Sequence, residues 1–304
     1  MTLDTKSYRY LEIRSLVIQA VRDFFTKNLY LEVETPILSP CIIPEAQIDP
    51  VTFEDMYLQS SPELCMKRLL SKGFNKIFQI CKCFRKNERG AHHLPELTML
   101  EWYAKDDSYL DLMDQCARLI KFIADRLNLK NQIKYQNKII NLSLPWKKLT
   151  VQQAFDIYAD KALSNALADN SFDEIISLQI EPHLGNKSPC FLYDYPASLA
   201  SLAKLLPDNP HYAQRFEFYL AGIELANGFT ELNDSIEQKS RFEIENKIRK
   251  SQNKTIFPLP EKFLTDIEKM PDAAGIALGV DRLVMIFCNV MSLDDVVTFT
   301  PENL

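Results

Sequence analysis

The feature that most constrains this chain is a set of three glutamates, seven residues apart, in a largely apolar stretch. Glu217, Glu224 and Glu231 lie between residues 215 and 232, among Phe, Leu, Ile and Tyr. A carboxylate in apolar surroundings costs free energy unless a cation neutralises it. We expect Mg²⁺ and a substrate amine as the cations, because Mg²⁺ combines one or two carboxylates with the oxygens of a triphosphate. The hypothesis is an ATP-using enzyme acting on an amino compound.

The secondary structure of this stretch has two interpretations. A spacing of seven fits one polar face of a helix. Apolar and polar residues alternate over 216–220, however, and Asn-Gly at 227–228 is a turn signal, so we favour two strands with a bend at 227–228. An odd spacing puts Glu217 and Glu224 on opposite faces of a strand unless a bulge or bend intervenes. Gly222 and the glycine of 227–228 are the candidates for it.

The composition is that of a globular protein. The 304 residues are 46% hydrophobic and 25% charged, so we expect a single domain over 1–304 with a less readable helical insertion at about 130–190. No signal peptide or apolar run of membrane-spanning length is recognisable, so we expect a cytoplasmic protein without membrane contact. The seven scattered cysteines indicate buried thiols. The net charge of −6 argues against binding a long nucleic acid.

Hydrophobic periodicity predicts a mixture of helices and strands. The predicted helices cover about 8–28, 61–71, 108–129, 150–158 and 171–178. The predicted strands cover about 30–36, 51–59, 76–85 and 97–103. Because these elements do not alternate regularly as β-α-β units, we expect an α+β fold in which helices flank an antiparallel sheet.

Two polar motifs follow the predicted strands. Residues 84–88 read Phe-Arg-Lys-Asn-Glu, and residues 92–96 read His-His-Leu-Pro-Glu. Arg85 at a strand end can clamp a phosphate through two hydrogen bonds, and a histidine in the returning loop can add a donor. Surface loops often contain both residue types, so a solvated pair of histidines is an equally simple interpretation.

Residues 275–285 and the pair Glu101 and Tyr103 complete the candidate site. The first is a small-residue strand followed by a helix, in which glycine permits close approach and Arg282 could meet an anion. It could equally be a packed corner with an exposed arginine. Glu101 and Tyr103 share a strand face and could form an anionic end to a pocket.

Together these motifs resemble the three signature motifs of class II aminoacyl-tRNA synthetases. Residues 31–36, Arg85 with 98–103, and 279–282 carry the resemblance. The lysyl branch is the most similar, through residues 61–63 and the glutamate-rich stretch. The resemblance covers nearly the whole chain and implies the class II synthetase catalytic core.

The spacing of the motifs points to one branch of that family. Lysyl-tRNA synthetases carry an anticodon-binding domain before the first motif, whereas here this motif lies within the first forty residues. The chain thus resembles the truncated paralogues that attach lysine or (R)-β-lysine to a lysine side chain of elongation factor P, and tRNA is not expected as a partner. Ala277 agrees, because lysyl-tRNA synthetases generally have glycine there. The extra methyl group of alanine can change the discrimination between two substrates by about 1–3 kcal/mol.

The resemblance also implies roles for single residues. Arg85 and Arg282 would be catalytic, on the α- and γ-phosphates of ATP, and Glu217 and Glu224 would bind Mg²⁺. The other expected ATP contacts are Lys86, Asn87, Glu88, His93, Leu94, Leu225 and Gly279. The expected substrate contacts are Glu63 for the backbone-side amine, Glu101, Tyr103 and Glu231 for the ε-amine, and Ser61, Pro62, Asn227 and Ala277. Pro36 would lie at a homodimer interface.

Two positions depart from the family pattern. Asn87 stands where glutamate is usual, with Glu88 displaced by one, and Leu94 stands where asparagine is usual. Both lie in the loop that normally holds ATP. A regulatory paralogue without activity and a tRNA-charging enzyme are therefore alternatives, although the intact Arg85 and Arg282 favour the ligase.

Overall fold

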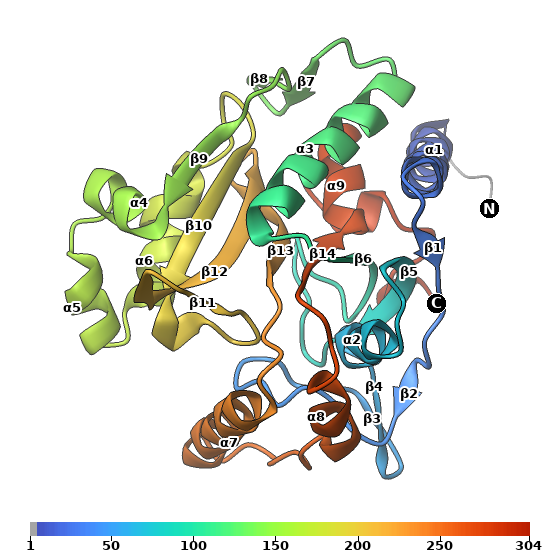
Figure 1. Ribbon diagram of the computed structural model, residues 1–304. Helices are drawn as coiled ribbons and strands as arrows, with labels where there is room; N and C mark the ends of the chain where they lie inside the picture. Colours follow the sequence, from blue (N-terminus) through green and yellow to red (C-terminus); the bar gives the residue numbers. More distant parts are fainter. Residues whose placement is uncertain (1–4) are drawn as a thin grey trace.

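A sheet of nine strands forms the centre of the protein, for which a computed structural model describes residues 5–304 (Figure 1). Across the sheet the strands are β1 (Leu31–Glu32), β5 (Lys76–Phe84), β6 (Glu96–Lys105), β14 (Ala273–Gly279), β13 (Ile223–Thr230), β12 (Asn209–Leu220), β10 (Cys190–Pro196) and β9 (Lys147–Thr150), with β11 (Leu205–Leu206) paired to β12. All pairs are antiparallel except β1 with β5 and β9 with β10. The expected α+β fold with a mainly antiparallel sheet is confirmed.

Three helices cover one side of this sheet: α1 (Thr5–Lys27), α3 (Tyr109–Arg126) and α9 (Val280–Phe287). α3 begins at a capping box between Ser108 and Asp111, and its apolar residues pack on β12, β13 and β14. Trp102 on β6 is fully buried among them and donates to Gln115 on α3 (2.5 Å). This core fixes the strands from which the candidate site is built. No helix formed by residues 5–304 combines the length and apolar character needed to cross a bilayer.

A second group of helices packs near β6 and the ends of β13 and β14: α2 (Glu63–Ser71), α7 (Ser235–Ser251) and α8 (Glu261–Ile267). They share a second core, in which Phe229 and Tyr103 take part. A small sheet of β2 (Leu38–Ser39), β4 (Met56–Leu58) and β3 (Thr52–Phe53) lies close by in Figure 1. The strand predicted over 51–59 is thus a hairpin, because Glu54 takes a positive φ of 53° and turns the chain.

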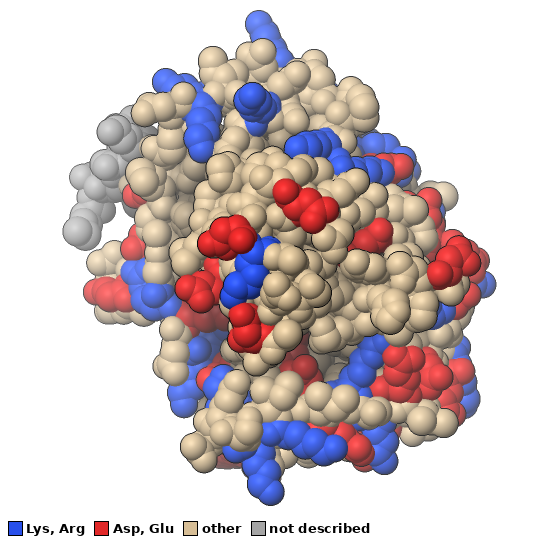
Figure 2. All heavy atoms as spheres, turned by 90° about the vertical axis from the view of Figure 1, so that its left-hand side faces the viewer, with Lys and Arg blue, Asp and Glu red and all other residues tan. Residues whose placement is uncertain are grey.

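The segment 130–190 contains strands as well as helices, so its description as a helical insertion was incomplete. Its elements are β7 (Gln132–Tyr135), β8 (Lys138–Asn141), β9, α4 (Val151–Tyr158), α5 (Leu163–Ala168), α6 (Phe172–Ile175), a π-helical turn (Ile176–Ile180) and a 3₁₀ turn (Glu181–His183). Further 3₁₀ turns lie at Ala197–Leu199, Leu293–Asp295 and Pro301–Asn303. Figure 2 shows the side of the molecule on which this segment lies, with acidic residues around the middle and Lys and Arg both above and below them.

The glutamate-rich stretch forms the hairpin β12–β13, but its turn is not at 227–228. The chain reverses at Ala221-Gly222, which have φ of 61° and 81°. The predicted bend is wrong because Gly228 lies within β13, paired to Phe216 and Ile276. A register shift leaves Leu225 as an extra residue, because Tyr219 pairs with Glu224 and Phe218 with 226. This bulge resets the alternation, so that Glu224 shares a face with Asn227.

Candidate active site

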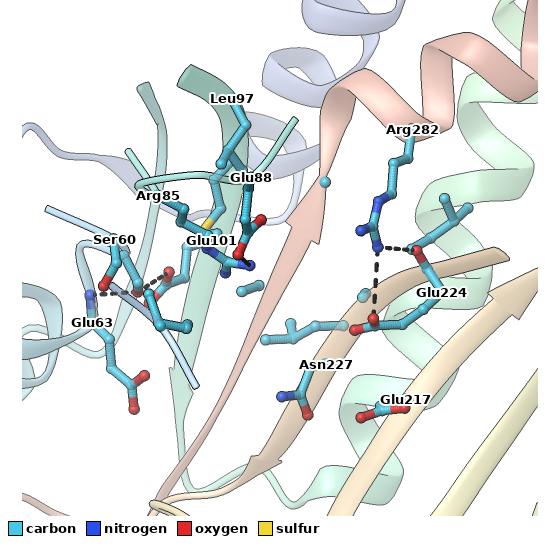
Figure 3. A pocket seen from close by; sticks show the side chains of 18 of the residues that line it. Ser60, Glu63, Arg85, Glu88, Leu97, Glu101, Glu217, Glu224, Asn227 and Arg282 are labelled. Carbon is cyan, nitrogen blue, oxygen red and sulfur yellow. Dashed lines mark hydrogen bonds and ion pairs between the residues drawn. The ribbon is translucent and has the colours of Figure 1, made fainter. Parts of the chain in front are cut away.

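A cavity of about 470 Å³ lies on the sheet, lined by residues of α2, β6, β12, β13, β14 and α9 and of the loops between them (Figure 3). Most predicted site residues line it. They are Ser61, Glu63, Arg85, Glu88, His93, Leu94, Glu101, Tyr103, Glu217, Glu224, Leu225, Asn227, Ala277, Gly279 and Arg282. Five predicted residues do not line it: Pro36, Pro62, Lys86, Asn87 and Glu231. The sheet therefore brings together motifs that are almost two hundred residues apart in the sequence.

The floor of the cavity is a row of residues paired across four neighbouring strands. Glu101 on β6 pairs with Ala277 on β14, which pairs with Asn227 on β13, which pairs with Glu217 on β12. Directly paired residues point to the same face of a sheet. The Ala277 methyl group therefore stands between Glu101 and Asn227, where it limits the depth available to a substrate.

A second row closes one end of the cavity. Gly275 on β14 pairs with Tyr103 on one side and with Phe229 on the other. A Cβ atom at Gly275 would come within 2.3 Å of Glu231 Oε1 and closer still to the Tyr103 ring. Glycine is therefore required here, because a Cβ atom would occupy the space that Glu231 Oε1 and the Tyr103 ring take up.

Glu101 is the acidic group at this end. Its carboxylate is almost fully buried and accepts hydrogen bonds from Tyr103 Oη (2.5 Å) and Ser61 Oγ (2.8 Å). Burial, and next the negative charge of Glu63, raise the pKa of Glu101 to about 8. A neighbouring ammonium would reverse this shift, so Glu101 is suited to receive one.

Lys67 on α2 is a charged group that the sequence motifs did not reveal. Its side chain is completely buried, and Nζ contacts Glu63 Oε1 (2.5 Å) and Glu231 Oε2. Burial alone would lower the pKa of Lys67, but the charges of Glu231 and Glu63 raise it overall. The local pattern, a lysine four residues after Glu63, predicts an ion pair on the helix surface and not a buried one.

Glu231 lies behind the cavity lining, fully buried. It was predicted to contact the substrate ε-amine directly, but Lys67 already stands at one of its oxygens. Oε1 is buried and accepts no hydrogen bond from residues 5–304. An acceptor of this kind, next to Gly275, is where a further donor can bind.

The opposite end of the cavity holds two arginines. Arg85 directly follows β5. Its Nη1 lies 3.8 Å from Glu88 Oε1, and its Nε is a buried donor without a partner among the described residues. Asn87 is exposed with φ of 65°, a conformation asparagine tolerates, and with Lys86 it lines a separate hollow. The predicted ATP contacts of Lys86 and Asn87 are thus not supported, because this turn directs the displaced Glu88 into the cavity.

Arg282, the second arginine, is held by neighbouring loops. It donates to the carbonyls of His92 (3.1 Å) and Glu224 (2.8 Å), and its Nη2 lies 2.7 Å from His93 Nε2. Burial and the charge of Arg282 lower the pKa of His93, so the imidazole is neutral and can accept from the guanidinium. The neighbouring Asp281 instead pairs with Arg14 (2.6 Å) and joins α9 to α1.

Glu217 and Glu224 lie beside Arg215 and Arg282. Glu217 accepts from Arg215 Nη2 (2.8 Å) and Tyr219 Oη (2.6 Å), and Glu224 Oε2 lies 3.6 Å from Arg282 Nη1. Burial and the charge of Glu217 raise the pKa of Glu224 to about 7, which a cation would reverse. Residues 5–304 contain no cluster of three or more groups suited to a metal. Two carboxylates fit Mg²⁺ if nucleotide oxygens complete its coordination.

Comparisons with known proteins agree with this geometry. The model of the family "tRNA synthetases class II (D, K and N)" matches residues 1–303. An elongation factor P--(R)-beta-lysine ligase of Pectobacterium carotovorum subsp. carotovorum (strain PC1) is 38% identical over 308 residues, which cover 95% of this chain and 94% of that protein. The protein of the same name from Salmonella typhi is 37% identical with the same coverage. The chain therefore belongs to the class II tRNA synthetase family and is an enzyme, a ligase.

Proposed function

We propose that this enzyme uses ATP to activate lysine or (R)-β-lysine as an aminoacyl-adenylate and transfers the acyl group to a lysine side chain of elongation factor P. The observation that carries the proposal is the single cavity with arginines at one end and a buried acidic pocket at the other. Such a cavity suits a substrate with a reacting carboxylate and a distant ammonium. The names of the relatives support the acceptor and the β-amino acid.

In the first step, a substrate carboxylate oxygen attacks the α-phosphorus of ATP and pyrophosphate leaves. Arg85, with its unpaired Nε, would hold the α-phosphate, and Arg282 the γ-phosphate. Glu217 and Glu224 would hold Mg²⁺, which neutralises phosphate charge. Glu88, His93, Leu94, Leu225 and Gly279 would surround the nucleotide. No protein nucleophile is needed, because catalysis rests on positioning and charge stabilisation.

The amino acid would extend from Arg85 towards the acidic end. Glu101 and Tyr103 would receive the ε-ammonium, with Glu231 behind them. Glu63 would face the amine nearer the carboxylate, and Ser61, Pro62, Asn227 and Ala277 would shape the space between. In the second step the deprotonated acceptor amine attacks the carbonyl carbon of the adenylate, and AMP leaves.

A labelling experiment tests the proposal. The enzyme is incubated with ATP and labelled L-lysine or (R)-β-lysine, together with either elongation factor P or tRNA, and the label on each macromolecule is measured. We expect label on elongation factor P alone. Label on tRNA would instead support the tRNA-charging alternative, and absence of ATP–pyrophosphate exchange with either amino acid would support a regulatory paralogue.

A homodimer through the Pro36 segment is part of the proposal, as is a cytoplasmic location, which follows from an acceptor that is a translation factor. Pro36 is exposed together with Leu31 (52%) and Ile37 (44%), an apolar surface of the kind that an interface covers. Analytical ultracentrifugation should give a dimer for the natural protein and a monomer for Ile37→Asp. A natural protein that sediments as a monomer would refute this part alone.

A further inference from the structure

One wall of the cavity comes from residues 45–49, a segment outside the recognised motifs. Glu45, Gln47 and Ile48 line the cavity together with Glu63 and Arg85. The segment has no regular secondary structure, so its shape depends on contacts with the rest of the fold.

The C-terminal end of α7 holds this segment in place. Arg249 is only 1% exposed and donates to the carbonyls of Glu45 (2.9 Å) and Ile48 (3.0 Å) and to Asp49 Oδ1 (2.9 Å). Glu245 Oε2 accepts from the backbone nitrogen of Ala46 (2.7 Å). The basic run at 247–254 thus includes a buried residue, Arg249, that fixes a wall of the cavity.

The Glu45 side chain differs from the other cavity carboxylates because it has no partner. Among residues 5–304 it forms no hydrogen bond or ion pair, whereas Glu63 contacts Lys67 and Glu101 accepts two hydrogen bonds. Burial and next the charge of Glu63 raise the pKa of Glu45 to about 7, while Arg85 opposes the shift. This carboxylate, on a backbone that Arg249 fixes, is therefore without an ion-pair partner among residues 5–304.

We propose that Glu45 binds the substrate ammonium nearest to the reacting carboxylate, on C2 of lysine or C3 of (R)-β-lysine. This inference rests on the proposed function. Glu63 already shares its charge with Lys67, so by itself it offers an incoming ammonium only part of a counter-charge. Glu45 lines the same cavity as Glu63 and Arg85 and supplies the missing negative charge there.

The proposal is tested by removing the charge either from Glu45 or from the substrate amine nearest to the carboxylate. In Glu45→Gln we expect the KM for lysine in pyrophosphate exchange to rise about 10- to 100-fold, the loss typical of a hydrogen bond to a charged group. The probe 6-aminohexanoate keeps the carboxylate and the ε-ammonium but lacks the second amine. Its inhibition constant should change less than about threefold, and so should the KM for ATP.

Controls separate this outcome from general damage. Glu243→Gln, on an exposed position of α7, should leave all constants unchanged. Glu45→Asp keeps the charge, so it should raise the KM for lysine less than Glu45→Gln does. If Glu45→Gln does not fold, the KM of Glu45→Asp for lysine is compared with that of the natural enzyme instead. The proposal is overturned if Glu45→Gln leaves the KM for lysine unchanged. It is also overturned if the variant weakens the binding of 6-aminohexanoate as much as that of lysine, or raises only the KM for ATP. Absence of exchange in the natural enzyme would instead refute the proposed function.

Discussion

The two ends of the cavity are built differently. At the acidic end, Lys67 and Glu231 are 0% exposed and are paired with each other. At the arginine end, the side chains of Arg85 and Glu224 are 27% and 36% exposed, and their ion pairs are long, at 3.8 and 3.6 Å. The acidic end is thus a buried charge network on which the fold depends, whereas the arginine end has loose pairs that a ligand can replace. Substitutions at the first should affect stability, and those at the second activity.

The largest effect is expected for Lys67→Met. It leaves the buried carboxylates of Glu63 and Glu231 without their cation, and removal of one partner from a buried ion pair costs about 3–5 kcal/mol. Urea denaturation measures this loss in the free energy of unfolding. Lys72→Met, at an exposed lysine after the same helix, should change it by less than about 0.5 kcal/mol. A Lys67 variant as stable as the natural protein would mean that the carboxylates are protonated and need no cation.

Arg85→Ala should show the opposite pattern. We expect adenylate formation to fall about 10²-fold or more, in line with removal of one preorganised donor, with little change in unfolding free energy because the side chain is partly exposed. Pyrophosphate exchange measures the first and urea denaturation the second. Lys82→Ala, at an exposed position of β5 three residues before Arg85, is the control. Undiminished exchange would remove Arg85 from the mechanism.

Glu231→Gln tests whether a substitution in the buried charge network also weakens substrate binding. It removes a charge from the Lys67 network and leaves a buried ammonium less well compensated, so we expect the KM for the amino acid to rise about 10- to 100-fold. The KM for ATP should change far less, because Glu231 lies behind the acidic end. Equal losses for both substrates would mean that this carboxylate serves the nucleotide or the metal.

Arg85, Glu101 and Arg282 line one cavity, as the sequence motifs led us to expect, because strand pairing determines which side chains share a face. Once Glu101 and Asn227 lie on strands next to β14, the row across Ala277 follows from period-two alternation. The turn at Ala221-Gly222 was missed because Asn-Gly is the stronger local signal for a hairpin, and pairing with two neighbouring strands overrode it.

Lys67 and Glu45 could not be assigned from sequence. A lysine on an amphipathic helix normally extends into water, and only the approach of Glu231, more than 160 residues away, makes burial of Lys67 possible. Glu45 lies in a segment without periodicity, and its position depends on Arg249, about 200 residues later. Both depend on long-range contacts that carry no local pattern.

The smallest effect is expected from a change of pH between 7 and 8. Because the pKa of Glu101 is raised to about 8, the folded protein holds a proton that the unfolded chain releases above about pH 4.5, so the free energy of unfolding should fall as pH rises from 5 to 8. One proton gives at most about 1.4 kcal/mol per pH unit. Glu45 and Glu224, with pKa values of about 7, contribute mainly below pH 7, and burial also raises the pKa of Glu231, so the contribution of Glu101 between pH 7 and 8 is the difference between the natural protein and Glu101→Gln. Glu101→Gln, which cannot ionise, should make the free energy of unfolding depend less on pH between 7 and 8. Bound lysine should do the same in the natural protein, because its ammonium stabilises the ionised carboxylate. An unchanged slope in Glu101→Gln would mean that another group holds this proton, and that the acidic end is charged before its ligand arrives.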